Sequence, residues 1–252
     1  MFTLISCLYL VHLDKLLKKD VEKNRLSTEE SNEILSRIHS ANSIDALNAC
    51  DIVIEAVSES VSLKHKIFQE LARVTSATTV LATNTSSISI TKIAGSIPDR
   101  DTSVIGMHFM NPVPVMKLVE IIPGLATSSD TLARTLSLAR DMGKTTTVSQ
   151  DVPGFIANRL LMPYINEAIM VLEQGVASKE DIDATMKLGT NVPMGPLTLA
   201  DFIGLDTCLA IMKVLHTELG ESKYRPAVLL QKYVDAGWLG KKSGKGFYSY
   251  SS

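Results

Sequence analysis

The hydrophobic pattern of this chain changes once, near residue 150, and that change constrains the fold more than any other feature. Before it, short apolar runs rich in β-branched residues alternate with segments in which apolar residues recur every three or four positions. The short runs are predicted strands at 51–57, 78–83, 103–107, 115–122 and 145–148. Strands that alternate with helices in this way predict a mostly parallel α/β sheet.

The part of the chain that follows Asp151-Val-Pro-Gly154 predicts helices only. Apolar side chains between Phe155 and Leu172 recur at helical spacing, which predicts one long helix with a wide apolar face. Gly175 stands where a helix commonly ends, because glycine adopts the left-handed conformation there. Pro163 removes one backbone hydrogen bond inside this helix and is expected to bend it.

Further helices are expected around 199–216 and 224–236, so the sequence predicts an α/β domain over residues 1–150 and an all-helical domain over 151–252. The length agrees with this division, because 252 residues exceed the usual single domain of about 100–150. Hydrophobic residues make up 45% and charged residues 21%, which excludes a disordered chain.

Charge and cysteine content exclude several classes of protein. The formal net charge is −2, whereas a general nucleic-acid binder needs a clear excess of lysine and arginine. Cys7, Cys50 and Cys208 lie far apart and form no CxxC or Cys/His cluster. A disulfide scaffold and a zinc site are therefore not expected, no metal is expected, and a reducing intracellular compartment fits better.

Residues 1–13 form an apolar run that continues directly into a lysine-rich stretch, 15–23. The run is too short for a membrane span, which needs about 20 residues, and no basic residue precedes it as in a signal peptide. Because apolar positions continue at helical spacing into the charged stretch, we predict one amphipathic helix that is buried or covered by a partner, without stable membrane insertion. Membrane contact or targeting is the alternative interpretation. The C-terminal Ser-Tyr-Ser-Ser is not a peroxisomal address.

Polar side chains gather where three predicted strands end, in Glu55–Lys64, Asn84–Ser87 and His108–Pro112. An α/β sheet binds ligands at the carboxyl ends of its strands, so these clusters are candidate site residues. His108 ends a central strand and Glu120 lies in the next one. An imidazole that a carboxylate orients through its far nitrogen can act as a general base. The alternatives are a structural histidine and a glutamate at a strand end on the surface.

Longer segments around these clusters resemble the L-3-hydroxyacyl-CoA dehydrogenase family, which includes the 3-hydroxybutyryl-CoA dehydrogenases. The resemblance runs from about residue 13 to the end, and its most specific parts are the HFxNP and PGFxxNR segments. The matching segments are Asn84-Thr-Ser-Ser-Ile-Ser-Ile, Gly106-Met-His-Phe-Met-Asn-Pro-Val-Pro-Val-Met-Lys-Leu-Val-Glu120, Asp151-Val-Pro-Gly-Phe-Ile-Ala-Asn-Arg-Leu-Leu161, Lys187-Leu-Gly, Pro193-Met-Gly-Pro-Leu and Gly240-Lys-Lys-Ser-Gly-Lys-Gly-Phe-Tyr248.

The resemblance implies a Rossmann-like, NAD-binding first domain and a helical second domain that serves substrate binding and dimerisation. The implied reaction is NAD-dependent oxidation of (3S)-3-hydroxyacyl-CoA to 3-oxoacyl-CoA in fatty acid metabolism, as in β-oxidation. His108 would take the proton of the 3-hydroxyl group, and Glu120 would hold the imidazole and stabilise its charged form. Ser86 and Asn158 would hydrogen-bond the reacting oxygens and the substrate. The alternative to these roles is that Ser86 and Asn158 cap helices.

The resemblance also implies residues that bind the cofactor and the coenzyme A portion of the substrate. The positions that match NAD contacts are Glu59, Lys64, Asn84, Ser86, Asn111 and Lys242. Lys19 matches a lysine that contacts coenzyme A, although the lysines of this segment also fit a solvated helix face. The apolar stretches Leu160–Leu172 and Leu197–Leu215 fit a homodimer interface, with an intramolecular core as the alternative.

One part of the family pattern has no match here. The family begins with a strand, a glycine-rich turn, a helix and a second strand, and the turn brings the cofactor pyrophosphate to a helix N-terminus. In this sequence the first glycine is Gly95. We therefore expect an N-terminally truncated member with an incomplete Rossmann-like sheet that binds NAD(H) weakly or not at all.

Three functions remain open at this stage. The first is an active 3-hydroxyacyl-CoA dehydrogenase. The second is a catalytically weak or inactive truncated isoform that acts as an acyl-CoA binder or dimerisation partner. The third is another β-hydroxyacid dehydrogenase of similar build, against which the HFxNP segment argues, because those enzymes generally depend on a catalytic lysine.

Overall fold

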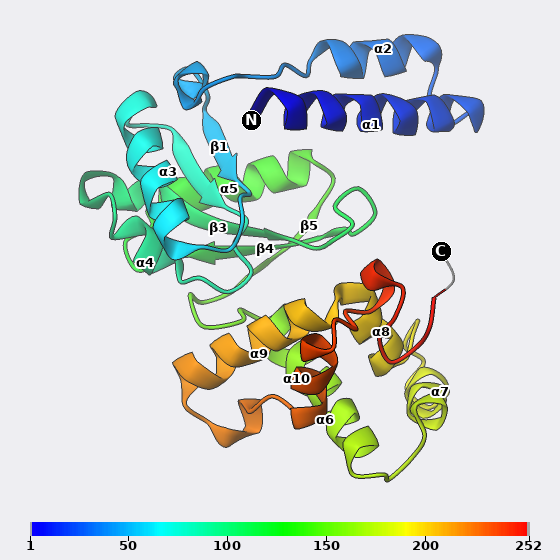
Figure 1. Cartoon of the computed structure of the whole chain (residues 1–252). Coiled ribbons are helices and arrows are strands. Elements are labelled where there is room, and N and C mark those ends of the chain that lie inside the picture. The colour runs from blue at the N-terminus through cyan, green and yellow to red at the C-terminus, as the bar shows by residue number, and fades with distance from the viewer. Residues whose placement is uncertain (1, 251–252) are drawn as a thin grey trace.

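A five-stranded sheet forms the centre of the first domain in the computed structural model, which describes residues 2–250 (Figure 1). The strands lie in the order β1-β2-β3-β4-β5, and every neighbouring pair is parallel except β3 and β4. Their bounds are β1 (Ile52–Glu55), β2 (Val80–Thr83), β3 (Val104–Phe109), β4 (Leu118–Pro123) and β5 (Thr145–Val148). The expected mostly parallel sheet is therefore confirmed.

Helices cover both faces of this sheet. Side chains alternate along each strand, so that Leu81 and Val104 point to one face and Ala82 and Ile105 to the other. The first face packs against α3 (Val61–Val74) and α4 (Ile90–Ala94), and the second against α5 (Ser129–Asp141). Short 3₁₀ turns lie at η1 (Ile44–Leu47) and η2 (Pro98–Ser103).

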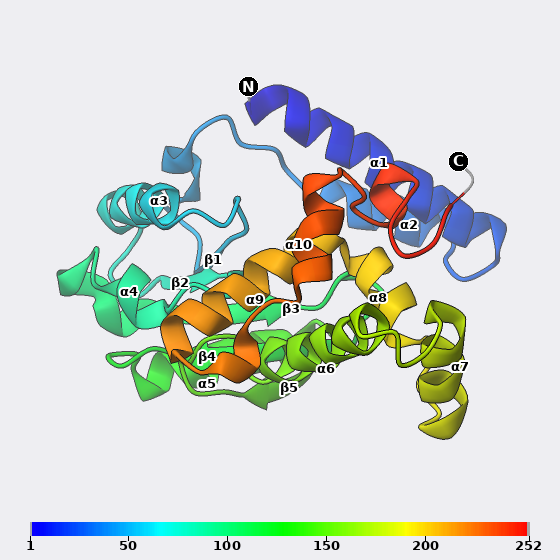
Figure 2. The ribbon, with the colours of Figure 1, turned by 60° about the horizontal axis from the view of Figure 1, so that its bottom comes forward.

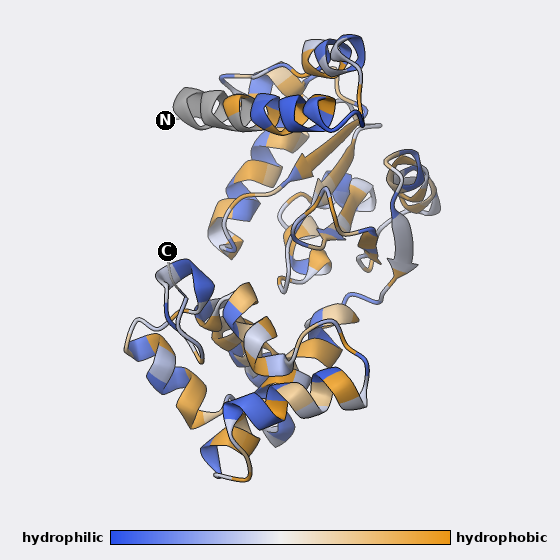
Figure 3. Cartoon of the chain, turned by 90° about the vertical axis from the view of Figure 1, so that its right-hand side faces the viewer, coloured by the Kyte–Doolittle hydropathy of each residue, from blue (hydrophilic) through white to orange (hydrophobic). Residues whose placement is uncertain are grey.

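The second domain is helical and has its own apolar core, in which α6, α9 and α10 pack together (Figure 2). Its helices are α6 (Ala157–Glu173), α7 (Lys179–Gly189), α8 (Pro196–Ile203), α9 (Leu205–Leu219) and α10 (Val228–Asp235), with 3₁₀ turns at η3 (Ser222–Tyr224) and η4 (Lys241–Ser243). Bands of hydrophobic and hydrophilic residues alternate along the helices, as expected where one face of a helix is buried (Figure 3).

Glycines and one proline shape these helices. Pro163 lies inside α6, and Gly175 follows its end with φ +69°, as predicted. The helix expected around 199–216 is divided at Gly204, whose φ of +104° ends α8 and lets α9 begin in a new direction.

The last residues fold back onto the helical domain around Asp201, which is fully buried at the end of α8. Its carboxylate accepts hydrogen bonds from the backbone N–H groups of Phe247 and Tyr248 and from the hydroxyl of Tyr250. Gly246 packs so closely against this carboxylate that a Cβ atom there would overlap it. The glycines of the C-terminal motif therefore allow this close approach.

Two helices, α1 (Phe2–Glu22) and α2 (Thr28–Ser36), lie side by side ahead of the sheet in sequence (Figure 1). Ser27 and Glu30 form a capping box at the start of α2, with both hydrogen bonds present. Leu17 is buried, while Val11 and Leu16 are exposed. For residues 2–10 and 12 the structure describes the backbone only, so the apolar run of 1–13 lies largely outside the described side chains. No helix within residues 2–250 is both long and apolar enough to cross a membrane.

Candidate active site

His108 and Glu120 face each other across the one antiparallel pair of strands. The register of β3 and β4 places the two residues directly opposite, so their side chains lie on the same face of the sheet. Both side chains are buried, and Nδ1 of His108 lies 2.8 Å from Oε2 of Glu120. The closeness expected from the sequence thus follows from strand pairing.

The second carboxylate oxygen of Glu120 binds the start of the helical domain. Oε1 accepts hydrogen bonds from the backbone N–H groups of Ile156, at 3.0 Å, and Ala157, at 2.9 Å, where α6 begins. Burial by itself raises the pKa of Glu120, but the hydrogen bonds from His108, Ala157 and Ile156 outweigh it and hold that pKa below its usual value. Glu120 is therefore an ionised carboxylate in neutral solution.

The charge of Glu120 decides which nitrogen of His108 carries the proton. A carboxylate only accepts hydrogen bonds, so Nδ1 of His108 carries the hydrogen and donates it to Glu120. In the neutral imidazole Nε2 then has a free lone pair, and no described residue makes a hydrogen bond to it. The edge of the Phe155 ring packs against the imidazole, with 5.7 Å between ring centroids. This histidine can accept a proton from a ligand.

Ser86 and Asn158 come from different domains and meet beside this pair. Ser86 lies in the loop after β2, and Asn158 lies in the first turn of α6, where it is buried. Nδ2 of Asn158 donates to the backbone oxygen of Ser86 at 3.3 Å. Neither residue is an N-cap, because Ser89 caps α4 and Ile156 precedes α6. The Ser86 hydroxyl makes no hydrogen bond to any residue that the structure describes, so it is available to a ligand.

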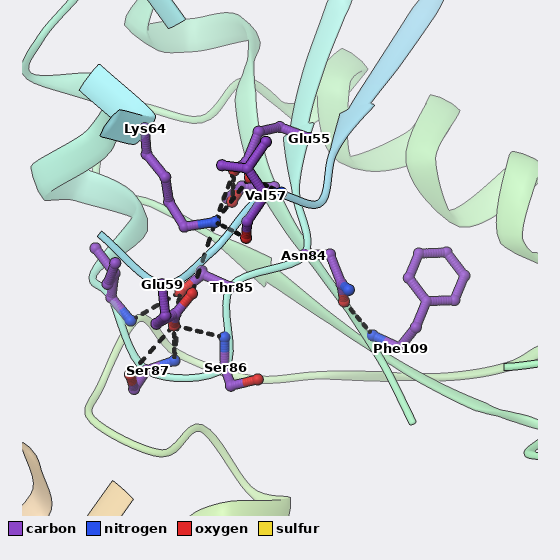
Figure 4. Close-up of polar contacts among 11 residues, drawn as sticks. Glu55, Val57, Glu59, Lys64, Asn84, Thr85, Ser86, Ser87 and Phe109 are labelled. Carbon is purple, nitrogen blue, oxygen red and sulfur yellow. Dashed lines mark hydrogen bonds and ion pairs between the residues drawn. The ribbon is translucent and has the colours of Figure 1, made fainter. Parts of the chain in front are cut away.

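Glu59 holds the Ser86 loop from the other side (Figure 4). Its Oε1 accepts hydrogen bonds from the Thr85 hydroxyl, from the backbone N–H groups of Ser86 and Ser87 at 2.9 and 3.0 Å, and from the Ser87 hydroxyl. Burial raises the pKa of Glu59, but the bond from Thr85, the charge of Lys64 and the backbone donors outweigh it and lower that pKa. Glu59 therefore fixes the backbone that carries Ser86.

Lys64 is fully buried. Its side chain points toward Glu55 and Val57 (Figure 4). Its Nζ lies 2.8 and 2.9 Å from the two carboxylate oxygens of Glu55 and 3.6 Å from Glu59. Glu55 also accepts hydrogen bonds from Val57 N–H and the Thr83 hydroxyl. The ammonium group thus joins two carboxylates, and it supports the Ser86 loop through Glu59.

The other residues that the sequence suggested are more dispersed. Oδ1 of Asn84 accepts from Phe109 N–H at 2.9 Å, and its Nδ2 has no partner among residues 2–250. Asn111 is exposed beyond the end of β3. Lys242 belongs to η4 and forms an ion pair with Asp206 at 2.6 Å, and Lys19 is exposed on α1. No group of three or more His, Cys, Asp or Glu side chains that could hold a metal ion is found within the described range.

Two models of one protein family cover almost the whole chain. The 3-hydroxyacyl-CoA dehydrogenase NAD binding domain matches residues 9–152, and the 3-hydroxyacyl-CoA dehydrogenase C-terminal domain matches residues 154–250. The chain belongs to the 3-hydroxyacyl-CoA dehydrogenase family. It is accordingly an oxidoreductase with NAD as its cofactor.

Relatives and solved structures of the 3-hydroxyacyl-CoA dehydrogenase family agree with this assignment. The probable 3-hydroxybutyryl-CoA dehydrogenase of Bacillus subtilis is 55% identical, over 96% of this chain and 84% of the relative. The human mitochondrial hydroxyacyl-coenzyme A dehydrogenase is 43% identical, over 94% of this chain and 76% of the relative. The crystal structure of (S)-3-hydroxybutyryl-CoA dehydrogenase from Ralstonia eutropha superposes with a TM-score of 0.91 at 49% identity, over 94% of this chain and 84% of that one.

Three polar atoms at one edge of the sheet have no hydrogen-bond partner among the described residues and are available to a ligand. The Ser86 hydroxyl, the Asn84 amide nitrogen and His108 Nε2 are polar atoms without partners among residues 2–250, and they lie at the carboxyl ends of β2 and β3. They suit a bound carboxamide or hydroxyl group. A glycine-rich turn has no counterpart here, since the first glycine of the sequence is Gly95.

Asp151 and Phe155 contribute contacts at this site that sequence reasoning did not assign. Both belong to the segment that resembles the 3-hydroxyacyl-CoA dehydrogenase family, so the motif was visible in the sequence. Asp151 binds the start of α4. Phe155 packs its ring against His108, and its backbone has a positive φ of +49°. Their partners lie tens of residues away, and no local spacing in the sequence indicates such contacts.

Proposed function

We propose that this chain catalyses the NAD-dependent oxidation of a (3S)-3-hydroxyacyl-CoA to the 3-oxoacyl-CoA, with His108 and Glu120 as the base pair. One observation carries the proposal. The ionised Glu120 fixes the hydrogen of His108 on Nδ1 and leaves the Nε2 lone pair free. A buried, oriented imidazole of this kind is what removal of a hydroxyl proton requires.

In the proposed reaction, Nε2 of His108 takes the proton of the 3-hydroxyl group while the C3–H bond breaks and the C3–O bond becomes a carbonyl. NAD⁺, when bound, supplies the acceptor for the hydride. The imidazolium that forms is stabilised by Glu120 at 2.8 Å. The Ser86 hydroxyl and the Asn158 side chain hydrogen-bond the substrate oxygen and hold C3 in position, an effect of orientation. The reverse reaction returns the proton from His108 to the oxygen.

The cofactor side of the site is proposed to comprise Glu59, Lys64, Asn84, Ser86, Asn111 and Lys242. Ser86 and Asn84 offer free polar atoms, whereas Lys64 acts through Glu59, because its ammonium group is enclosed. Lys19 is exposed on α1 and is proposed to meet the phosphates of coenzyme A. Since similar proteins are named 3-hydroxybutyryl-CoA dehydrogenases, we propose a short-chain substrate and a role in fatty acid metabolism.

The experiment that tests this function is reduction of acetoacetyl-CoA by NADH, followed at the absorbance of NADH. We expect 3-hydroxybutyryl-CoA as the product and loss of turnover in His108→Gln. Binding of acetoacetyl-CoA without turnover, in a folded protein, would contradict the proposal. That result would favour the second candidate, a catalytically weak form that binds acyl-CoA, which is motivated by the absence of glycine before Gly95.

We further propose that the helical domain forms a homodimer. A groove of about 390 Å³ lies between α6 and α7, lined mainly by apolar side chains that include Ala168, Val171 and Ile182. The exposed Val176 lies in the turn beside it, so a second copy can insert its own turn by two-fold symmetry. Light scattering during gel filtration should give twice the mass of the chain, and Met186→Glu in the groove should shift it to the monomer. A wild-type monomer at micromolar concentration would contradict this proposal.

A further inference from the structure

Asp151 lies in the segment that joins β5 to α6, and its carboxylate binds the start of α4 in the first domain. Oδ1 accepts a hydrogen bond from Ile90 N–H at 2.9 Å. Oδ2 accepts hydrogen bonds from Thr91 N–H and from the Ser89 hydroxyl, both at 2.8 Å. One side chain of the interdomain segment thus satisfies backbone donors at the first turn of α4, which would otherwise lack partners.

The place of α4 in the chain gives these bonds their importance. The Ser86 loop leads directly into α4, so Asp151 fixes the loop at one end. Glu59 fixes the same loop at the other end, through Thr85, Ser86 and Ser87. The backbone that carries Ser86 is therefore held between two carboxylates, one from the sheet domain and one from the interdomain segment.

The same segment also places the start of α6. Three residues after Asp151 the chain turns at Gly154, whose φ is +79° and where a Cβ atom would lie 2.8 Å from Leu215. Beyond this turn, the N–H groups of Ile156 and Ala157 bind Glu120. Asn158 then reaches the backbone oxygen of Ser86. The position of Asp151 therefore determines how the Ser86 loop and the start of α6 meet.

We propose that Asp151 is a positioning residue of the reaction. Its hydrogen bonds hold the interdomain segment against α4 and thereby fix the positions of the Ser86 hydroxyl, Asn158 and the His108–Glu120 pair relative to one another. This inference rests on the proposed function for its kinetic consequence. Asp151 touches no reacting atom, so its effect passes through Ser86 and Asn158. Misplacing such groups by about 1 Å lowers a rate on the order of a hundredfold.

Asp183 offers a matched control within the same chain. Its carboxylate accepts two backbone and one hydroxyl hydrogen bond at the start of α8, from Leu197 N–H at 2.8 Å, Thr198 N–H at 2.9 Å and the Thr198 hydroxyl at 2.6 Å, and one more from the Tyr248 hydroxyl at 3.0 Å. This cap lies inside the helical domain and none of its bonds involves the Ser86 loop. Asp183→Asn therefore reports the cost of losing a helix cap without disturbing the site.

The test compares Asp151→Asn and Asp183→Asn in the full chain. In Asp151→Asn the amide keeps the bond from Ile90 N–H but turns a donor toward Thr91 N–H and the Ser89 hydroxyl. We expect kcat for acetoacetyl-CoA reduction to fall by about ten- to a hundredfold, with KM changed less than about threefold. Asp183→Asn should lower Tm at least as much and leave kcat within about twofold. Equal kcat in the two variants would overturn the proposal.

A second measurement separates this inference from the proposed function. The rate at which diethylpyrocarbonate modifies His108, with His108→Gln as the blank, reports access to the imidazole and needs no turnover. We expect Asp151→Asn to raise this rate severalfold and Asp183→Asn to leave it unchanged. An unchanged rate in a folded Asp151→Asn protein would overturn the inference even if the enzyme is active. If Asp151→Asn does not fold, Ser89→Ala takes its place, because it removes one of the three hydrogen bonds to Asp151. The same kcat and the same rate of His108 modification are then compared with those of Asp183→Asn.

Discussion

Nδ1 of His108 lies 2.8 Å from Oε2 of Glu120, and the two residues are direct partners in the register of β3 and β4. Because one strand pair carries both groups, their separation depends on backbone hydrogen bonds and not on flexible loops. The other oxygen of Glu120 is held by two backbone N–H groups of α6. The carboxylate therefore cannot rotate away from the imidazole without losing bonds to the second domain.

Glu120→Gln is expected to impair the reaction by reversing the tautomer of His108. The amide oxygen still suits the N–H groups of Ile156 and Ala157, so the amide NH₂ turns toward Nδ1. Nε2 then carries the hydrogen and cannot accept a proton. We expect kcat to fall by about 10²–10⁴-fold. Glu180→Gln, on the exposed start of α7, is the control and should keep full activity; equal activity of the two variants would remove Glu120 from its proposed role.

His108→Gln should abolish proton transfer while the fold remains intact. A glutamine amide cannot accept the hydroxyl proton, so the loss in kcat should reach about 10²–10⁴-fold. His216→Gln, at the exposed end of α9, is the matched control and should not change kcat. Circular dichroism and Tm confirm folding of both variants. Turnover of the His108→Gln protein near the wild-type rate would show that another group is the base.

The low pKa values of Glu59 and Glu120 predict how stability depends on pH. Both carboxyl groups release their protons at lower pH in the folded chain than in the unfolded chain. In the unfolded chain the pKa of glutamate is about 4.3. The unfolded state therefore binds more protons in acid. The stabilisation is fully present above about pH 4.3 and is lost as the pH falls through the folded-state pKa values. Urea denaturation across this range should show a smaller acid loss in Glu120→Gln than in the wild type; parallel curves would contradict the assignment.

Lys64→Met is expected to destabilise the fold strongly. Glu55 would keep its bonds from Val57 N–H and Thr83 but would be a buried carboxylate without its cation. Breaking such a pair from one side costs about 3–5 kcal/mol. Lys66→Met, at an exposed position of the same helix, should change the free energy of unfolding by less than about 0.5 kcal/mol. Denaturant titration measures the free energy of unfolding of the two variants, and equal values would contradict the prediction.

The polypeptide of these 252 residues is expected to bind NADH weakly. A glycine-rich turn offers backbone N–H groups to the pyrophosphate, and each charged hydrogen bond contributes about 1.5–3 kcal/mol. A polypeptide without two such bonds binds at least about a hundredfold more weakly than one that makes them. Fluorescence titration with NADH measures this, with a chimera that carries the N-terminal segment of the Bacillus subtilis relative as the reference. Micromolar binding by the unextended chain would refute the expectation.

Local patterns predicted most of the architecture. The β-branched runs and the glycine that ends α6 each depend on neighbours within a few residues, and the structure contains both. The division at Gly204 was not predicted, because the apolar periodicity on both sides of it is helical.

The contacts that complete the site depend on long-range packing. Lys64 carries a charge, which in a sequence suggests exposure, but it is buried and pairs with Glu55 at the end of β1 and with Glu59 in the loop that follows. The bonds from Asp151 to α4 and from Glu120 to α6 join segments that only the folded domains bring together. Burial and pairing of these charges could therefore be found only in three dimensions.

Glu120 contacts His108 with one oxygen and the second domain with the other, so the boundary between the domains passes through the His108–Glu120 pair. Pulling the domains apart at this point would break two charged hydrogen bonds, at a cost of about 1.5–3 kcal/mol each. A change in the angle between the domains is least costly when its pivot lies at the start of α6. The atoms nearest a pivot move least, so a rotation of the domains about this point would change the distance between His108 and Glu120 very little.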